Sequence, residues 1–154
     1  LGLAPESCAS DGVYCLWESG ADNFDGVVVL QGSEVTYVFV NEVLPKLQEE
    51  GVNLKVMYVS SPELFDRIPE KERTAIYSEE MARNAMGITG FTLPTMYRWI
   101  QSDLGRKYTM HPFQKGRYLG SGPGDDVIRE AGLDGPGQYR GIKKFLDATI
   151  NEKN

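Results

Sequence analysis

An unbroken apolar run that ends in a glycine-serine turn is the feature that most constrains the fold of this chain. Residues 26–30 read Gly-Val-Val-Val-Leu, and Gln31, Gly32, Ser33 and Glu34 follow them. A strand that is apolar on both faces is typical of a parallel sheet covered by helices on both sides. Gly32 permits a sharp turn, and we expect Ser33 to cap the free N–H groups of a following helix. The run therefore predicts the opening of a parallel α/β unit, and the turn is a candidate crevice.

The residues after this turn continue the pattern of a strand-helix-strand crossover. Apolar residues recur at helical spacing over 34–51, so we expect a helix there. Pro45 lies inside it and removes a backbone hydrogen bond, which predicts a kink near residues 41–43. Residues 54–59 form the next predicted parallel strand, and the Ser-Ser-Pro-Glu sequence at 60–63 is typical of a capped helix start.

Elements on either side of this crossover complete the predicted fold. Residues 1–11 are small and polar and predict a linker from a preceding domain, and residues 12–154 predict one folded domain. We expect a strand at 12–17 to pair antiparallel with the strand at 26–31, because the connection between them is too short for a helical crossover. Two further strands are predicted at 85–91 and 107–110. One further helix is predicted within 69–84, and another is predicted to start at Thr92 or Thr95 and to end at about 104. The last two predicted helices are at 125–131 and 138–150. The predicted fold is an α/β three-layer sandwich with a mostly parallel five-stranded sheet that carries one antiparallel edge strand.

Composition excludes several classes of protein. The chain has 154 residues, of which 41% are hydrophobic, and this is enough for one domain with a real core. Its formal net charge of −6 argues against binding to nucleic acid phosphates or anionic lipids. No stretch approaches the roughly 20 apolar residues of a membrane span, and no signal peptide pattern is present, so we expect a soluble protein.

The cysteine and histidine content predicts no zinc site. Cys8, Cys15 and the single His111 cannot supply the four ligands of a structural zinc. Both cysteines are expected to be reduced thiols, which indicates the cytoplasm. His111 is a candidate general base or pH switch, although a lone histidine beside a proline is more commonly a surface or packing residue.

Three short segments rich in glycine and serine form the candidate site, as a possible anion-binding or interface loop. The first two follow predicted strands, where open α/β sheets bind ligands. The third is a glycine loop whose N–H groups are able to form an anion nest, although two aspartates stand where a phosphate-binding loop requires Lys-Ser or Lys-Thr. Turn formation and helix capping are the preferred explanation of the segments at Gly32 and Gly120. The candidate residues are Gly32, Ser33, Glu34, Ser60, Ser61, Gly120, Ser121 and Gly122.

Two further groups of side chains have a structural and a functional interpretation. Phe91, Met96, Tyr97 and Trp99 form an aromatic-rich stretch that suits either an interface or the core. The basic residues of the same region suit a phosphorylated sugar, an acidic partner or a solvated face. They are Arg98, Arg106, Lys107, Lys115 and Arg117.

Four motifs in a fixed order resemble the C-terminal domain of transketolases. Residues 12–18 contain that family's GxYxL strand, 26–35 its apolar strand ending in GSE, and 54–66 its strand leading to S-x-x-x-LFD. Residues 117–125 are similar to its R-F-G-x-S-x-P-G element. The resemblance extends from residue 12 to about 150. The chain departs from the family at Met86-Gly87-Ile88-Thr89-Gly90, where V-E-A-G is common, and at an insertion over 113–115.

The resemblance implies a supporting rather than a catalytic domain. In that family thiamine diphosphate and a divalent metal, Mg or Ca, lie between the two preceding domains across a homodimer interface. The family's C-terminal domain has neither cofactor motif nor catalytic residues, so none is assigned to this chain. The implied function is dimer support in a pentose phosphate transferase, with packing against the cofactor-binding domains of the same chain. Alternatives are the C-terminal domain of the decarboxylating component of a 2-oxo acid dehydrogenase, a regulatory module that binds an anion or phosphometabolite, and a flavodoxin-like redox domain.

Overall fold

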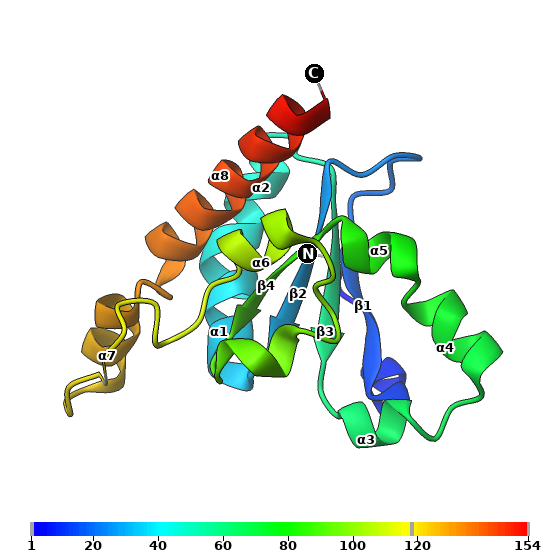
Figure 1. Ribbon diagram of the computed structural model, residues 1–154, viewed down its shortest axis with the longest axis horizontal. Coiled ribbons are helices and arrows are strands. Elements are labelled where there is room, and N and C mark those ends of the chain that lie inside the picture. Colours follow the sequence, from blue (N-terminus) through cyan, green and yellow to red (C-terminus); the bar gives the residue numbers. More distant parts are fainter. Residues whose placement is uncertain (1, 118, 154) are drawn as a thin grey trace.

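A computed structural model describes residues 2–117 and 119–153 of the chain. Leu1 of the predicted linker, Tyr118 of the motif at 117–125 and Asn154 at the end of the predicted domain lie outside the described residues. A central sheet has helices packed on both of its faces, as Figure 1 shows. The predicted three-layer α/β architecture is therefore present.

The sheet has four strands in the order β1-β3-β2-β4. They are β1 (Val13–Glu18), β2 (Gly26–Gln31), β3 (Leu54–Val59) and β4 (Ala85–Thr89). Two pairings place β3 and β4 parallel to β2 on its two sides, whereas β1 is antiparallel to β3 at one edge. The register aligns the ends of the parallel strands, because Gln31 of β2 pairs with Val59 of β3 and with Thr89 of β4.

Two predictions about the sheet are wrong. The strand β1 pairs with β3 and not with β2, because β2 is the central strand and has a parallel neighbour on each side. The predicted fifth strand at 107–110 is replaced by the end of a helix, and only Met110 reaches the sheet, in a single parallel bridge to Ile88. Pro112 follows two residues later, and because proline has no N–H, it cannot extend a ladder of sheet hydrogen bonds.

One face of the sheet is covered by the first crossover and by the C-terminal helix. The crossover consists of α1 (Ser33–Val38), a π-helical turn η2 (Phe39–Val43) and α2 (Leu44–Glu49). The long helix α8 (Gly135–Lys153) lies beside it, as Figure 1 shows, and begins three residues before its predicted start. Together they bury the larger of two apolar clusters, whose fully buried members include Phe39, Leu47 and Ile142.

The predicted kink at Pro45 takes the form of the π-helical turn. The Leu44 N–H donates to the carbonyl of Phe39, five residues back instead of four. The wider turn separates the Pro45 ring from the carbonyl that it would clash with in a regular α-helix. A single proline thus explains why one predicted helix becomes three consecutive helical segments.

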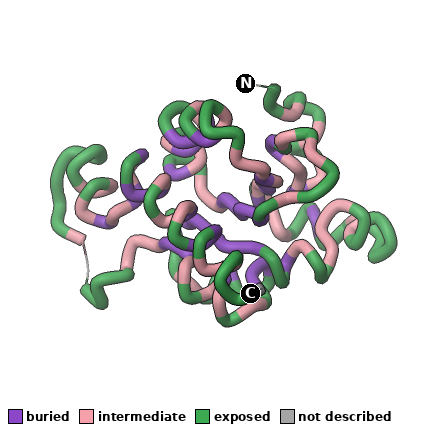
Figure 2. The backbone as a smooth tube through the Cα atoms, turned by 90° about the horizontal axis from the view of Figure 1, so that it is seen from above, coloured by how far each residue is buried: buried purple, intermediate pink, exposed green. Residues whose placement is uncertain are grey.

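The other face of the sheet is covered by shorter elements. They are α3 (Pro62–Phe65), α4 (Glu70–Ile76), α5 (Glu79–Arg83) and a 3₁₀ helix η3 (Leu93–Met96). The second apolar cluster lies beneath them, and Phe65, Met96, Trp99 and Ile100 pack there against the sheet. Figure 2 shows the buried residues concentrated in the middle of the molecule, with exposed segments around them.

Three further elements complete the fold. The predicted helix from Thr92 or Thr95 to about 104 is wrong, because Ser102 starts a new helix, α6 (Asp103–Tyr108), by accepting a hydrogen bond from the Gly105 N–H. The predicted helix at 125–131 is present as α7 (Gly124–Ala131). The expected linker carries a 3₁₀ helix η1 (Glu6–Asp11). Cys8 and Cys15 are both free thiols, as predicted.

Candidate functional site

The carboxyl edge of the three parallel strands is the natural place to look for a site. The chain leaves β2 toward the face covered by α1, whereas it leaves the neighbouring strand β4 toward the opposite face, where η3 lies. Ligands of open α/β sheets bind where adjacent connections diverge in this way. The position is marked by Gln31 and Gly32 at the end of β2 and by Thr89 and Gly90 at the end of β4.

A hydrogen-bonded cluster occupies this divergence point. The Gln31 side-chain carbonyl accepts from the hydroxyl of Thr89 at 3.0 Å and from that of Thr95 at 2.9 Å. The Thr89 oxygen in turn accepts from the Phe91 N–H at 3.0 Å, and the Gly90 N–H donates to the Gln31 backbone carbonyl. The cluster ties the ends of β2 and β4 to η3, so its polar groups serve the fold of this edge.

The Gly32 turn is closely packed and leaves little space above it. Gly32 has φ +106°, a conformation that favours glycine, and a Cβ there would lie 3.6 Å from the Phe91 ring. The expected capping by Ser33 is wrong, because Gly32 is the N-cap residue, Ser33 begins α1 and no side chain caps this helix. The Thr36 hydroxyl instead donates back to the Gly32 carbonyl at 2.7 Å.

The serines that follow β3 have structural hydrogen bonds. The carbonyl of Gly12 accepts from the N–H groups of Ser60 and Ser61 and from the Ser60 hydroxyl at 3.0 Å. The Ser61 hydroxyl oxygen accepts from the Leu64 N–H at 3.2 Å, which confirms the predicted cap of α3. These bonds join the beginning of β1 to the end of β3.

The glycine loop near residue 120 has an acidic environment. The Gly120 N–H donates to the Glu130 carboxylate at 3.3 Å, so one donor of the supposed anion nest already has an anionic partner. A Cβ on Gly124 at the start of α7 would lie 3.7 Å from the Glu34 carboxylate. Asp125 and Asp126 occupy the first turn of α7. Since negative charge already compensates this helix N-terminus, a bound anion would be repelled. The structure thus brings Glu34 to the start of α7, whereas Ser121 and Gly122 remain exposed.

The aromatic stretch after β4 divides into a buried and an exposed part. Met96 and Trp99 are in the core, where Trp99 makes edge-to-face contacts with Phe65 and Tyr77. Phe91 and Tyr97 remain 54% and 43% exposed. The Arg106 guanidinium lies 4.6 Å from the centre of the Tyr97 ring, and its Nε donates to the Ile100 carbonyl. The core interpretation is therefore confirmed for Met96 and Trp99, whereas the interface interpretation stays a prediction for Phe91 and Tyr97.

The basic residues of the same region have partners within the chain. Arg98 donates to both carboxylate oxygens of Asp66, and Arg73 donates to the same carboxylate at 3.3 Å. These bonds lower the pKa of Asp66, chiefly through Arg98. Arg117 pairs with Glu130 at 3.0 Å, and the Lys115 ammonium donates to the Glu130 carbonyl. These contacts favour the interpretation of the region as a solvated face over a phosphate site.

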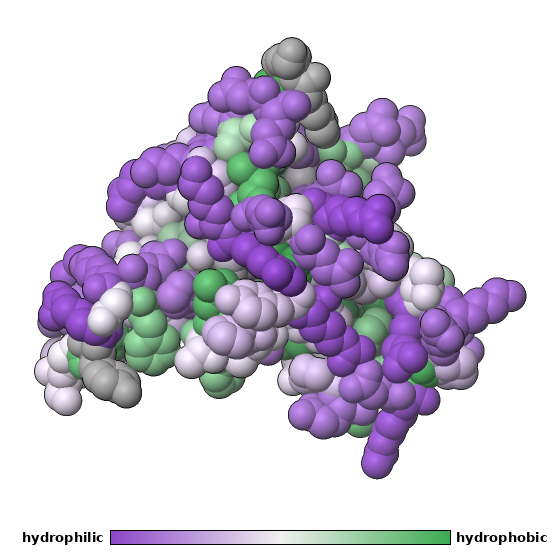
Figure 3. Space-filling view, viewed as in Figure 1, coloured by the Kyte–Doolittle hydropathy of each residue, from purple (hydrophilic) through white to green (hydrophobic). Residues whose placement is uncertain are grey.

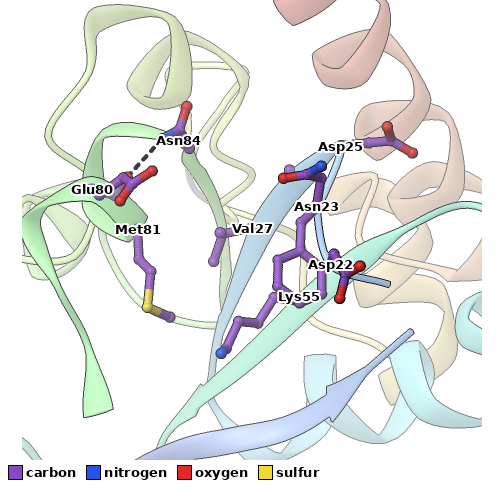
Figure 4. Close-up of a pocket in the computed structure, with 10 residues that line it drawn as sticks. Asp22, Asn23, Asp25, Val27, Lys55, Glu80, Met81 and Asn84 are labelled. Carbon is purple, nitrogen blue, oxygen red and sulfur yellow. Dashed lines mark hydrogen bonds between the residues drawn. The ribbon is translucent and has the colours of Figure 1, made fainter. Parts of the chain in front are cut away.

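A cavity of about 360 Å³ lies at the opposite, amino edge of the sheet. Figure 4 shows Glu80, Met81 and Asn84 of the α5 segment on one side of it and Lys55 of β3 on the other. The Lys55 ammonium is paired with Glu18 at 3.4 Å. The lining is polar and holds three carboxylates, those of Asp22, Asp25 and Glu80. Its position is not the one at which open α/β sheets bind ligands.

His111 makes a local contact. Its Nδ1 accepts from the Phe113 N–H at 3.3 Å, within the turn that follows the Met110 bridge. Partial burial lowers the pKa of His111 from its ordinary value of 6.5. The geometry favours the packing interpretation of this residue.

The described part of the chain has neither a metal-binding group of side chains nor a helix that could span a membrane. Among residues 2–117 and 119–153, no three His, Cys, Asp or Glu side chains are grouped so as to hold a metal ion. The residues present therefore do not fit the divalent metal that the resemblance implies for the whole enzyme. None of the described helices is both long enough and apolar enough to cross a membrane.

Sequence reasoning missed the polar cluster at the divergence point. Gln31, Thr89 and Thr95 are far apart in the sequence, and only the parallel pairing of β2 with β4 brings them together. The available signal was that Gln31 and Thr89 each end an apolar strand with a polar residue.

Comparisons with known proteins support the fold. No family model matches the sequence, and no curated protein sequence matches it significantly. Solved transketolase structures do match the coordinates. That of Leishmania mexicana superposes with a TM-score of 0.69 at 16% identity and covers 96% of this chain. A transketolase mutant from Pichia stipitis gives a TM-score of 0.67 at 19% identity over 98% of this chain, and the Campylobacter jejuni enzyme gives 0.62 at 18% over 88%.

The match is confined to one part of those proteins. This chain spans 20% of the Leishmania and Pichia chains and 19% of the Campylobacter chain. One matched Pichia structure, with a TM-score of 0.67, is a complex with sedoheptulose-7-phosphate. At these identities the comparison establishes a shared fold with a domain of transketolases.

Proposed function

We propose that this chain is the C-terminal domain of a transketolase-like, thiamine-diphosphate-dependent enzyme and has no catalytic activity alone. The observation that carries the proposal is the superposition of nearly the whole chain, 96% to 98%, on a fifth of transketolase chains. Four sequence motifs in the order of that family's C-terminal domain support the same assignment.

The arrangement of polar groups at the carboxyl edge supports a structural role. Gln31, Thr89 and Ser61 are all engaged in hydrogen bonds that hold strands and helices in place. The acidic groups at the start of α7 argue against the alternative of an anion-binding module. The chemistry would then depend on groups supplied by other domains.

The remaining parts of the proposal concern the whole enzyme. Residues 1–11 would connect to preceding domains of the same chain, and those domains would bind thiamine diphosphate with Mg or Ca across a homodimer interface. That cofactor stabilises a carbanion during transfer of a two-carbon unit. The residues of this chain would contribute packing and dimer support. We further propose the cytoplasm as the location of the enzyme and the pentose phosphate sugars as its substrates.

The longer protein whose gene includes this sequence provides the test of the proposal. We expect thiamine-diphosphate-binding domains upstream of Leu1, and we expect the longer purified protein to transfer a two-carbon unit from a ketose phosphate when supplied with the cofactor and Mg. The 154-residue chain is expected to show no turnover in the same assay. Turnover by this chain alone, or a gene that begins at Leu1, would contradict the proposal.

The same assay separates the nearest alternative. A decarboxylating component of a 2-oxo acid dehydrogenase would consume a 2-oxo acid and release carbon dioxide, and it would not need a sugar acceptor. Activity with a 2-oxo acid but not with ketose phosphates would therefore assign the longer protein to that class.

A further inference from the structure

The helix α7 buries little of its surface against the rest of the domain. Of its eight residues only Ala131 is buried, while Ile128 is half-buried and packs against the larger apolar cluster. Asp125, Asp126 and Arg129 are exposed. Figure 1 shows α7 at one end of the molecule, beyond α1 and the start of α8, and Figure 3 shows hydrophilic residues over much of the surface at this end. Segments with so little buried apolar surface open most readily in native proteins.

The two ends of α7 are held differently. At its carboxyl end Gly132 has φ +74°, the Gly132 N–H donates to the Arg129 carbonyl, and the Leu133 N–H donates to the Ile128 carbonyl. This is a Schellman turn, and the buried Leu133 anchors it in the core. At the amino end the N-cap residue is Pro123, and no described side chain caps the helix. The helix is therefore able to pivot at Gly132 while its amino end moves.

The basic side chains of the preceding loop bind close to this pivot. Arg117 pairs with the Glu130 carboxylate at 3.0 Å, and the Gly120 N–H donates to the same carboxylate at 3.3 Å. The Lys115 ammonium donates to the Glu130 carbonyl at 2.9 Å. Because Glu130 is in the last turn of α7, these bonds do not need to break when the amino end of the helix moves.

A cavity of about 420 Å³ separates α7 from the first crossover and from the start of α8. Its apolar lining comes from Val38 of α1, Ile128 of α7 and Pro136 of α8, one residue from each helix. Side chains that face a void lack the dispersion attraction of close-packed neighbours. The inner face of α7 is thus only partly in contact with the domain.

The carboxylates on the two sides of this cavity repel one another. Glu42 of η2, Asp125 of α7 and Asp134 before α8 all line it. Among the described residues the one cation in the lining is Arg129, which pairs with Asp126 of its own helix at 3.2 Å. Repulsion between exposed charges is reduced by dissolved salt. The separation of α7 from the crossover should therefore depend on ionic strength.

A further carboxylate faces the amino end of α7 from α1. A Cβ on Gly124 would lie 3.7 Å from Oε1 of Glu34. A single carboxylate at a helix N-terminus is favourable, but Asp125 and Asp126 already compensate the dipole of this helix. Glu34 therefore adds repulsion at the end of α7 that is free to move.

We propose that α7 is a hinged flap that pivots at Gly132 and opens toward solvent when the repulsion between carboxylates across the cavity is not screened. Ile128 and Ala131 hold the flap closed through apolar contacts, whereas Glu34 and Glu42 repel its amino end. The fold thus contains a conformational switch that responds to ionic strength. The proposal concerns this domain alone and does not depend on the proposed function.

Hydrogen exchange at two salt concentrations tests the flap. The 154-residue chain is labelled in about 20 mM and about 500 mM sodium chloride, and peptides from residues 124–131 and 139–149 are compared. We expect α7 to exchange at least about tenfold faster than α8 at low salt, because α8 has Ile142 and Phe145 in the core. The higher salt concentration should slow exchange in α7 by about threefold or more and leave α8 unchanged.

Paired charge variants identify the source of the salt effect. Glu34→Gln with Glu42→Gln removes the two crossover carboxylates, and Glu70→Gln with Glu72→Gln removes the same number of charges from α4 on the other face of the sheet. Because all four side chains are exposed, neither pair should unfold the domain. At low salt only the first pair should slow exchange in α7, by about threefold or more, and α7 should then no longer respond to salt.

Ile128→Ala tests the apolar contact that closes the flap. The substitution removes contact with the larger cluster and leaves every carboxylate in place. We expect exchange over residues 124–131 to rise by about tenfold at both salt concentrations, with a smaller change in α8.

Four results would overturn the proposal. Equal exchange in α7 and α8 would mean that α7 opens only when the whole domain unfolds. Exchange in α7 that does not depend on salt, or equal effects of the two charge-variant pairs, would exclude carboxylate repulsion as the cause of opening. An Ile128→Ala variant that exchanges like the unmodified chain would exclude the apolar contact as the closing force. The proposed function would stand in each case, because it is decided by the longer protein.

Discussion

Single glycines decide how closely the elements of this domain approach one another. Gly105 in α6 faces the start of β4, and a Cβ on Gly105 would lie against the carbonyl oxygen of Ala85 and against the Ser102 hydroxyl that caps α6. Gly122, by contrast, has nothing within 4 Å of its Cβ position. The two glycines look alike in the sequence, and only the structure distinguishes a packing requirement from a surface loop.

Gly105→Ala is therefore expected to be strongly destabilising. The clash is with backbone, which cannot move as a side-chain end can, so we expect a loss of about 1–3 kcal/mol in the free energy of unfolding. Urea unfolding followed by circular dichroism measures it, and Gly122→Ala is the control, with an expected change within about 0.5 kcal/mol. Equal effects of the two substitutions would contradict the packing of α6 against β4.

His111 is expected to make stability depend on pH in mildly acidic solution. Partial burial lowers its pKa below the ordinary value of 6.5, so the unfolded chain binds the proton more tightly than the folded one. Stability should then fall as the pH drops from about 7 to about 5. Protonation of Nδ1 would also remove the acceptor of the Phe113 N–H.

His111→Asn is expected to flatten this dependence. Thermal unfolding at pH 7 and pH 5 should show a smaller difference in Tm for the variant than for the unmodified chain. The carboxylates Asp66 and Glu50 do not confound the comparison, because their pKa values are lowered by Arg98 and by Tyr139 respectively and their contribution is lost only at more acidic pH. A variant with the full pH dependence would exclude His111 as its source.

At the scale of elements, periodicity and capping signals predicted most of the helices. The kink at Pro45, the cap of α3 at Ser61 and the helix at 125–131 all follow from local chemistry, and the structure confirms them. The wrong helix predictions arise where two local capping signals compete. Thr92 and Thr95 both resemble helix starts, but η3 is short and the Ser102 cap begins a separate helix. Local sequence did not indicate which cap would be used.

Two serines that follow parallel strands, Ser33 and Ser61, provide a direct test of capping. Ser61 caps α3 and Ser33 caps nothing, although both follow a parallel strand. Ser61→Ala should lower the free energy of unfolding by about 1 kcal/mol, or Tm by about 2–4 °C in a domain of this size. Ser33→Ala should change Tm by less than about 1 °C. A larger effect at Ser33 would mean that α1 begins differently from the structure.

At the scale of the whole molecule, the sheet separates two apolar clusters that must fold together. Val28 and Leu30 of β2 belong to the cluster under α1 and α8, whereas Val27 and Val29 belong to the cluster under η3. Alternate residues of one strand thus stabilise both layers. Because both layers pack against the same strands, we expect a single cooperative unfolding transition.

One conservative substitution in each cluster tests this cooperativity. Ile142→Val and Ile100→Val are both fully buried changes, in α8 and beneath the opposite face. Each should lower the free energy of unfolding by about 1 kcal/mol, and the double variant should show their sum within about 0.5 kcal/mol. Calorimetry is expected to show one transition in every case. Two transitions, each shifted by only one of the substitutions, would indicate independent layers.

The order in which the strands pair was less predictable from the sequence than the helices and strands themselves. The continuous apolar run of β2 correctly indicated a buried parallel strand, and the antiparallel edge strand is present. The partner of β1 and the number of strands were predicted wrongly, because strand order depends on crossovers between distant segments. The same reason explains why the Gln31 cluster was missed while Gly32 was found.

The order of the strands has a consequence for assembly. Residues that end up adjacent on the carboxyl edge are separated by long stretches of sequence, so this edge acquires its final shape only after β2, β3 and β4 have all aligned. A partially folded chain would therefore lack the hydrogen bonds by which Gln31 joins Thr89 and Thr95, so this edge is expected to be among the last parts of the domain to become ordered.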